Sequence, residues 1–220
     1  MLNLLFPKLC NGCKKELLKN ESVLCTRCLH TLPLANHHQT GDTTMKELFY
    51  GRVPIEHATA LLRFSKKGIT QELLHNLKYR GQKEISAFLG DWLGAELAQD
   101  SSYRGIEGVV AVPLHKKKLK IRGYNQVDGF AKALSEALEV PYFDTVLVKL
   151  GKTSSQVFKQ RGKRFESEGV FTLQHPELIA HKHLLLVDDI VTTGATIEKC
   201  AQQLLNAPGV KLSLATMAIA

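Results

Sequence analysis

The sequence predicts an α/β fold, with a parallel sheet flanked by helices and a small metal-binding module at the N-terminus. From residue 109 to the C-terminus, strand-like and helix-like segments alternate, which is typical of parallel sheets. Two Cys-x-x-Cys motifs lie within the first 28 residues, which indicates a metal-stabilised module. A chain of 220 residues is long enough for one hydrophobic core and a small appendage.

The composition is that of a basic, folded protein. The net charge is +8 and 44% of the residues are hydrophobic, so an anionic partner such as a nucleotide or a nucleic acid is favoured. A basic surface without such a partner is the alternative. The sequence contains no apolar run of about 18 residues, which a membrane span needs. Its start lacks the basic and long apolar regions of a signal peptide, and we therefore predict a cytoplasmic location.

Four of the five cysteines form the two Cys-x-x-Cys motifs, which are separated by eleven residues. In a cytoplasmic chain this pattern indicates one Zn²⁺ held tetrahedrally by four thiolates, while disulfides or unliganded thiols are the alternatives. His30, His37 and His38 follow closely, but four cysteines complete a closed shell, so we leave the histidines outside it. Residues 1–50 are expected to form this module and a polar linker. The predicted ligands are Cys10, Cys13, Cys25 and Cys28.

A strand and two helices are predicted next. Residues 58–64 have the apolar pattern of a strand, and residues 67–81 form a helix that Gly81 could end. Residues 85–98 form a second helix, whose aromatic stripe we interpret as core packing rather than as a base-stacking surface. The apolar faces consist of Ile69, Leu73, Leu74 and Leu77 in the first helix and of Phe88, Leu89, Trp92, Leu93 and Leu97 in the second.

A strongly basic segment, HKKKLKIRGYNQ, directly follows the strand predicted at 109–112. Ligands of α/β sheets bind at the carboxyl ends of strands, and a pyrophosphate needs cations there. A solvated charged face is the alternative. Gly123 would let the backbone turn toward a helix predicted at 127–138. The predicted anion-binding residues are His115, Lys116, Lys117 and Arg122.

A long polar stretch follows the strand that ends near Leu150. Loops of this length in compact domains are usually lids or binding loops, or else disordered. We predict a flexible binding loop in which Gln156, Arg161 and Arg164 are the residues of interest.

The segment LLLVDDIVTTGATIEKC, residues 184–200, predicts a ribose-phosphate site. A buried strand at 184–187 is followed by Asp188 and Asp189, then by a small-residue loop and a helix, and a last strand is predicted at 211–220. Loop N–H groups and the helix N-terminus suit a phosphate. The acids suit ribose hydroxyls and a Mg²⁺ held mostly by the ligand, whereas an ordinary strand–turn–helix is the alternative. The loop residues are Thr192, Thr193, Gly194, Ala195 and Thr196.

VDDIVTTGAT resembles the PRPP-binding signature of type I phosphoribosyltransferases. The order of the cysteine pairs, the basic block, the Gln-Arg-Arg loop and this signature resembles the ComF family, in which a zinc finger precedes a phosphoribosyltransferase-like domain. The resemblance implies a zinc-ribbon module at 1–50, a hood at 51–106 and a core at 107–220. It also implies PRPP with Mg²⁺, a role in DNA uptake during natural transformation, single-stranded DNA and a helicase-type partner. FESEGVF departs from the family, which commonly has an asparagine before this phenylalanine.

Two functions of different classes stay open at this point. The first is a Mg²⁺-dependent phosphoribosyltransferase that displaces pyrophosphate from PRPP, with Asp188 and Asp189 at the ribose. The second is a non-catalytic module that binds single-stranded DNA or a helicase and uses the fold as a scaffold. The acidic pair favours a phosphorylated ribose at this site over DNA, because carboxylates are unfavourable beside DNA phosphates.

Overall fold

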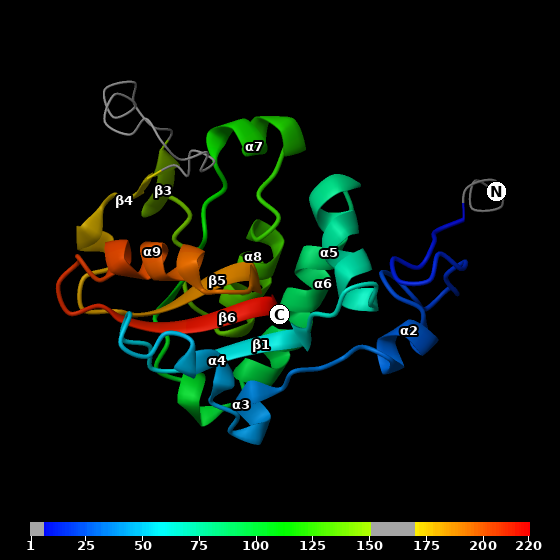
Figure 1. Cartoon of the computed structure of the whole chain (residues 1–220), viewed down its shortest axis with the longest axis horizontal. Coiled ribbons are helices and arrows are strands. Elements are labelled where there is room, and N and C mark those ends of the chain that lie inside the picture. The colour runs from blue at the N-terminus through cyan, green and yellow to red at the C-terminus, as the bar shows by residue number, and fades with distance from the viewer. Residues whose placement is uncertain (1–6, 151–169) are drawn as a thin grey trace, which may run out of the picture.

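A computed structural model describes residues 7–150 and 170–220. Its centre is a four-stranded, entirely parallel sheet with the strand order β1-β6-β5-β2, shown in Figure 1. The predicted α/β fold with a parallel sheet is confirmed. The strands are β1 (Ala58–Arg63), β2 (Gly108–Ala111), β5 (His183–Val191) and β6 (Lys211–Ile219).

Strand β5 is longer than predicted. We expected it to end at Val187, but it continues to Val191 and therefore includes both acids. The extension forms because β6 pairs with it throughout, from His183 opposite Lys211 to Val191 opposite Ile219. Asp188 and Asp189 consequently lie inside a buried strand rather than in an exposed turn.

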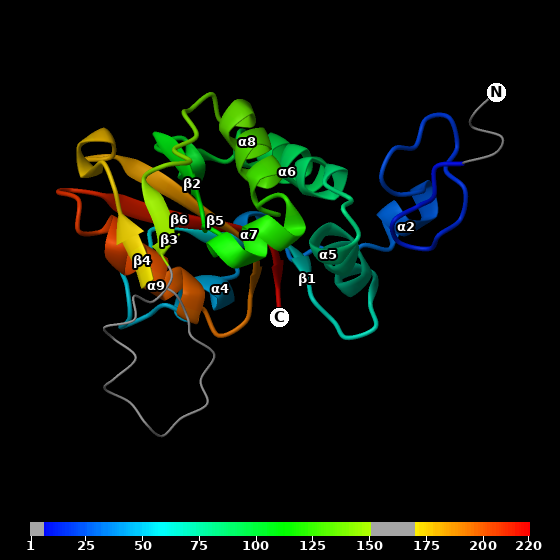
Figure 2. The same cartoon turned by 90° about the horizontal axis from the view of Figure 1, so that it is seen from above.

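Helices cover both faces of the sheet, as Figure 2 shows. On one face α6 and α8 pack closely, since a Cβ atom at Gly90 would lie only 2.7 Å from Cβ of Ala133. The other face is covered by α9 and by residues of α4, whose Met45 is completely buried. Of these four helices, α6, α8 and α9 are predicted by the sequence and confirmed, whereas α4 lies in the stretch expected to be a polar linker. Their bounds are α4 (Thr44–Glu47), α6 (Glu84–Leu97), α8 (Asp128–Ala137) and α9 (Ala195–Leu204).

Helix α5 (Ile69–Tyr79) lies between the sheet domain and the N-terminal module, which contains α2 (Thr26–His30) (Figures 1 and 2). Its predicted apolar face is confirmed, because Leu73, Leu74 and Leu77 are buried in one cluster with Cys10 and Cys28 of the module. The module therefore shares a hydrophobic core with the rest of the chain.

The segment expected to be a polar linker is ordered by contacts with β1. It contains the short helices α3 (His37–Thr40) and α4. The backbone N–H of Ala35 donates to the carbonyl of Leu61, and the N–H of Ala60 donates to Nδ1 of His37. Edge-strand hydrogen bonding thus fixes a segment whose composition predicted a loop.

The strand predicted near Leu150 lies outside the central sheet. It is β3 (Leu147–Leu150), which pairs antiparallel with β4 (Val170–Leu173) in a separate two-stranded sheet. The basic segment forms the short helix α7 (Lys116–Arg122), which ends at Gly123 in a left-handed conformation. Among residues 7–150 and 170–220, short 3₁₀ helices also occur at Ser101–Tyr103 and Pro176–Leu178.

Strand β1 comes from the stretch expected to form the hood, 51–106, yet it pairs with β6 in the central sheet. Both predicted parts of the phosphoribosyltransferase-like domain thus contribute strands to one sheet. The division at residue 106 stays a prediction. Within the described residues, the helices are too short or too polar to cross a membrane.

Candidate functional site

The two acids of β5 lie at its carboxyl end and are almost fully buried, with 8% of Asp188 and 5% of Asp189 exposed. Neighbouring residues of a strand point to opposite faces. Asp189 accordingly contacts Lys78 of α5 and Gln126, which lies just before α8, whereas the charge of Asp188 acts on Cys200 of α9. The pair therefore joins the two layers of helices at one edge of the sheet.

Asp189 is held by two side chains from distant parts of the sequence. Gln126 Nε2 donates to Asp189 Oδ2 over 2.7 Å, and Lys78 Nζ lies 3.0 Å from the same oxygen. Gln126 is itself buried, and its side-chain oxygen accepts a hydrogen bond from Arg122. Its backbone carbonyl accepts from Ser86 Oγ over 2.6 Å. This network orients the carboxylate of Asp189 within the fold.

Asp188 experiences a strongly perturbed environment. Burial, and then the negative charge of Asp189, raise the pKa of Asp188 to about 8, although the Asp189 N–H, Lys78 and Lys149 act in the opposite direction. The Asp189 N–H donates to Asp188 Oδ1 over 2.8 Å. A carboxyl group that stays partly protonated near neutral pH can both donate to and accept from a sugar hydroxyl.

The loop after β5 leads directly into α9. Gly194 adopts a left-handed conformation, with a φ of 75°. Helix α9 begins at Ala195, so the N–H groups of its first turn lack partners inside the helix. The loop lines a small hollow that also includes Asp188. Donors and a positive helix end thus lie beside the acids, which suits a phosphate attached to a ribose.

Phe49 and Arg52, which lie between α4 and β1, support this loop. The sequence analysis did not predict either residue as part of the site. Arg52 Nη1 donates to the carbonyl of Thr193 over 2.8 Å, and Arg52 Nε donates to Glu198 Oε2 over 3.0 Å. A Cβ atom at Gly194 would lie 2.7 Å from the ring of Phe49. The loop is therefore packed from behind, and a side chain at 194 would disturb it.

Of the predicted anion-binding residues, Arg122 is connected to the acidic pair by hydrogen bonds. Arg122 reaches the pair through Gln126, whereas His115 caps α7 by accepting from the N–H of Lys117 over 3.2 Å. Lys116 and Lys117 are exposed on the same helix. The predicted loop residues Gln156, Arg161 and Arg164 lie outside the described residues.

A cleft between α5 and α7 adjoins the acidic pair. It has a volume of about 290 Å³ and is open between the side chains of both helices. The guanidinium of Arg122 lies 5.6 Å from the ring centre of Tyr79, whose side chain is largely exposed. The cleft is lined by Lys78, Tyr79, Lys118, Ile121, Arg122 and Tyr124.

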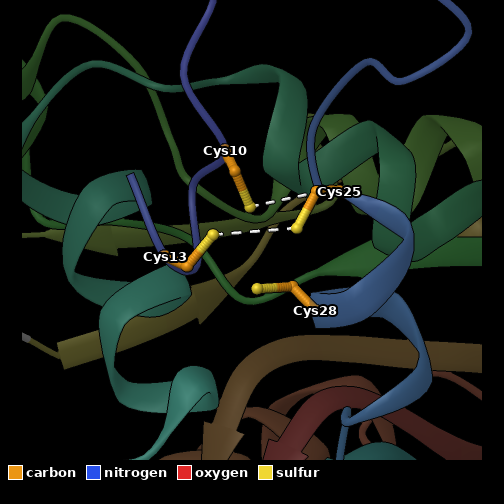
Figure 3. Close-up of side chains that lie close together, drawn as sticks. All are labelled: Cys10, Cys13, Cys25 and Cys28. Carbon is orange, nitrogen blue, oxygen red and sulfur yellow. Dashed lines mark hydrogen bonds between the residues drawn. The ribbon is translucent and has the colours of Figure 1, made fainter. Parts of the chain in front are cut away.

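The four cysteines of the two motifs converge on one point, as Figure 3 shows. All are free thiols, and their sulfur atoms lie within 4.8 Å of one another. A zinc ion with Zn–S bonds of about 2.3 Å would place tetrahedral sulfur atoms roughly 3.8 Å apart, and the Cys13 and Cys25 sulfurs are 3.7 Å apart. The cluster could therefore hold a metal ion such as zinc.

Backbone donors around Cys10 favour its thiolate form. Burial raises the pKa of Cys10, but N–H groups of Gly12, Cys13 and Cys25 outweigh this effect and bring it down to about 6. His37 and His38 bond instead to β1 and α6, through Ala60, Thr59 and Glu96. The histidines thus have other partners, in agreement with their omission from the predicted metal shell.

The module is fixed to α5 by polar contacts as well as by the shared core. The buried side chain of Asn76 donates to the carbonyl of Asn11 over 3.0 Å, and Lys14 Nζ lies 2.8 Å from Glu72 Oε1. The same helix carries Lys78 in its last turn. Helix α5 thus connects the cysteine cluster with the acidic pair.

The chain is similar to several known proteins. The family model of the phosphoribosyl transferase domain matches residues 129–219. The DNA utilization protein YhgH of Escherichia coli O157:H7 is 31% identical over 138 residues, which are 61% of this chain and 60% of that relative. The competence protein ComFC of Bacillus subtilis strain 168 is 27% identical over 90% of this chain and 78% of its own. Among solved structures, a purine phosphoribosyltransferase of Pyrococcus horikoshii covers 61% of this chain and 73% of its own, with a TM-score of 0.40 and 17% identity.

Proposed function

Because the chain belongs to the ComF family, with its phosphoribosyltransferase-type fold, we propose that it binds PRPP or a related ribose phosphate. The observation that carries this proposal is the buried acidic pair beside a donor-rich loop. Asp188 and Asp189 are costly to bury, and a phosphate alone would be repelled by them. A ligand that combines a phosphate with hydroxyl groups satisfies both halves of the site.

In this proposal each element has one task. The N–H groups and hydroxyls of residues 192–196 bind the 5-phosphate. Asp188 and Asp189 bind the ribose hydroxyls and stabilise positive charge at the ribosyl centre. Arg122 and the other cations of 115–122 bind the pyrophosphate, where a Mg²⁺ that enters with PRPP would supply further charge neutralisation. Gln156, Arg161 and Arg164 remain predicted members of the binding loop.

Calorimetry with PRPP and Mg²⁺ tests the binding proposal. The double substitution Asp188→Asn and Asp189→Asn should abolish binding, because amides provide weaker acceptors for hydroxyls and no negative charge. An exposed aspartate of α6, Asp91, provides the matched control as Asp91→Asn. Unchanged affinity in the double variant, in a protein that still unfolds cooperatively, would contradict the proposal.

Catalysis is tested separately, by release of pyrophosphate from PRPP. The reaction joins a nitrogen nucleophile to the ribose carbon as the bond to pyrophosphate breaks. Wild-type protein should release pyrophosphate with one member of a panel of bases, and Asp188→Asn should not. Binding of PRPP without release in any member of the panel would favour a ligand-sensing role over an enzyme.

The second candidate function is binding of single-stranded DNA, with a role in DNA uptake beside a helicase-type partner. It is favoured by the cleft between α5 and α7, where the exposed side chains of Tyr79 and Ile121 lie among basic residues. The names of the relatives, a DNA utilization protein and a competence protein, agree with such a role.

Fluorescence anisotropy of a labelled oligonucleotide across a salt series tests this second candidate. Four phosphate contacts give a log–log slope of about 3, so a fourfold rise in salt would weaken binding about fifty-fold. Charge reversal of Lys117, Lys118 and Lys120 should flatten the slope and, if the cations are shared, weaken PRPP binding. No binding at low salt would exclude this function, and a slope unchanged by the triple variant would exclude α7 as its site.

A further inference from the structure

Lys78 lies at the acidic pair although no sequence pattern marked it. It is the penultimate residue of α5, and its ammonium nitrogen is 3.0 Å from Oδ2 of Asp189. Only 22% of the lysine side chain and 7% of the aspartate side chain are exposed. Ion pairs on an open surface contribute little and are easily replaced by water. This pair is instead largely shielded from solvent.

The position of Lys78 is set by a firmly held helix end. The hydroxyl of Tyr124 donates to the carbonyl of Leu77, the residue before Lys78. The side chain of Asn76 is buried against Asn11 of the N-terminal module. Leu77 itself is completely buried. The backbone on the N-terminal side of Lys78 is thus anchored on two sides, which directs its ammonium group toward β5.

Both donors of Asp189 converge on a single oxygen. The ammonium group of Lys78 and the amide group of Gln126 each contact Oδ2. Together these two donors hold the carboxylate in one rotamer, and the lysine balances its negative charge. A ribose hydroxyl is then expected at the other oxygen of the same carboxylate. Removal of Lys78 would leave the buried carboxylate of Asp189 without its charged partner, which favours a different rotamer of Asp189.

We propose that Lys78 is a positioning residue of the ribose site, which acts through Asp189 by orienting its carboxylate and balancing its charge. This inference rests on the proposed binding of a ribose phosphate. It assigns α5, a helix far upstream of the phosphate loop, a direct part in recognition of the sugar. It also predicts that the loop at 192–196 does not depend on Lys78, since Arg52 and Phe49 support that loop from elsewhere.

The experiment compares two ligands by calorimetry, ribose 5-phosphate and inorganic phosphate. Lys78→Met removes the charge but keeps an unbranched chain, and Lys78→Arg keeps the charge. Lys132→Met, at an exposed position of α8, is the matched control. Lys78→Met should weaken ribose 5-phosphate binding about tenfold or more and leave phosphate binding unchanged. Lys78→Arg should restore most of the affinity, and Lys132→Met should have no effect.

A double-mutant cycle shows whether Lys78 acts through Asp189. In an Asp189→Asn background, Lys78→Met should cause no further loss of ribose 5-phosphate affinity. The inference would be overturned if Lys78→Met weakened the binding of ribose 5-phosphate and of inorganic phosphate equally. It would also be overturned if Lys78→Met lowered the ribose 5-phosphate affinity further in the Asp189→Asn background. Wild-type affinity in Lys78→Met would overturn it as well. Wild-type protein that binds phosphate but neither ribose 5-phosphate nor PRPP would overturn the proposed function itself.

Discussion

Replacement of Asp188 by asparagine should stabilise the fold at alkaline pH while it removes ribose-phosphate binding. The side chain is buried in β5, and its environment raises the pKa from an ordinary value of 3.8 to about 8. Between these values the native state holds a proton that the unfolded chain has released. The free energy of unfolding of the wild type therefore falls as the pH rises through this range. Asparagine cannot ionise and avoids this loss.

The magnitude follows from the size of the shift. Each pKa unit corresponds to about 1.4 kcal/mol, so a shift from 3.8 to about 8 sets an upper limit of about 6 kcal/mol. Relaxation of the site and entry of water lower this value, and we expect a gain of about 2 kcal/mol near pH 8. Asparagine preserves an acceptor for the Asp189 N–H, which donates to Asp188 Oδ1 over 2.8 Å. The difference should vanish near pH 4, where both side chains are neutral.

Urea denaturation of wild type and Asp188→Asn at several pH values between about 4 and 8 measures this effect. In the difference between the two free energies of unfolding, the pH-dependent contributions of the titratable groups that both proteins share cancel. Asp91→Asn, at an exposed position, should show no such pH-dependent difference. A variant that is destabilised by the same amount at every pH would refute the reasoning, because it would show that Asp188 ionises in the fold as it does in the unfolded chain.

Three further predictions concern the metal cluster, the phosphate loop and the module contact. Protein purified without chelator under reducing conditions should contain one zinc ion by elemental analysis, and less than about a third of an equivalent would contradict a closed four-thiolate site. Arg52→Met should weaken inorganic phosphate binding up to about tenfold, because the Thr193 carbonyl and Glu198 lose their donors; unchanged affinity by calorimetry would show that the loop holds its shape alone. Asn76→Leu should lower the free energy of unfolding by about 1–3 kcal/mol in urea, because the buried Asn11 carbonyl loses its donor, and wild-type stability would argue against docking through this contact.

The sequence by itself determined most elements of the fold and the composition of the candidate site. The spacing of apolar residues predicted the buried faces of α5 and α6 and the strands β2 and β6. The run of small residues predicted the loop before α9. The cysteine spacing similarly predicted the convergence of four sulfur atoms. These features are local, because residues a few positions apart are placed by the geometry of one helix, strand or turn.

Only the tertiary structure decided which side chains meet at the acidic pair. Pairing with β6 extended β5 past Val187 and buried both acids, and contacts with β1 ordered a segment whose composition predicted a linker. Three side chains reach the site from distant segments: Lys78 from α5, Gln126 from the residues just before α8, and Arg52 from the segment after α4. Such contacts join residues far apart in the chain, so they depend on how whole elements pack, and no periodicity or local spacing encodes them.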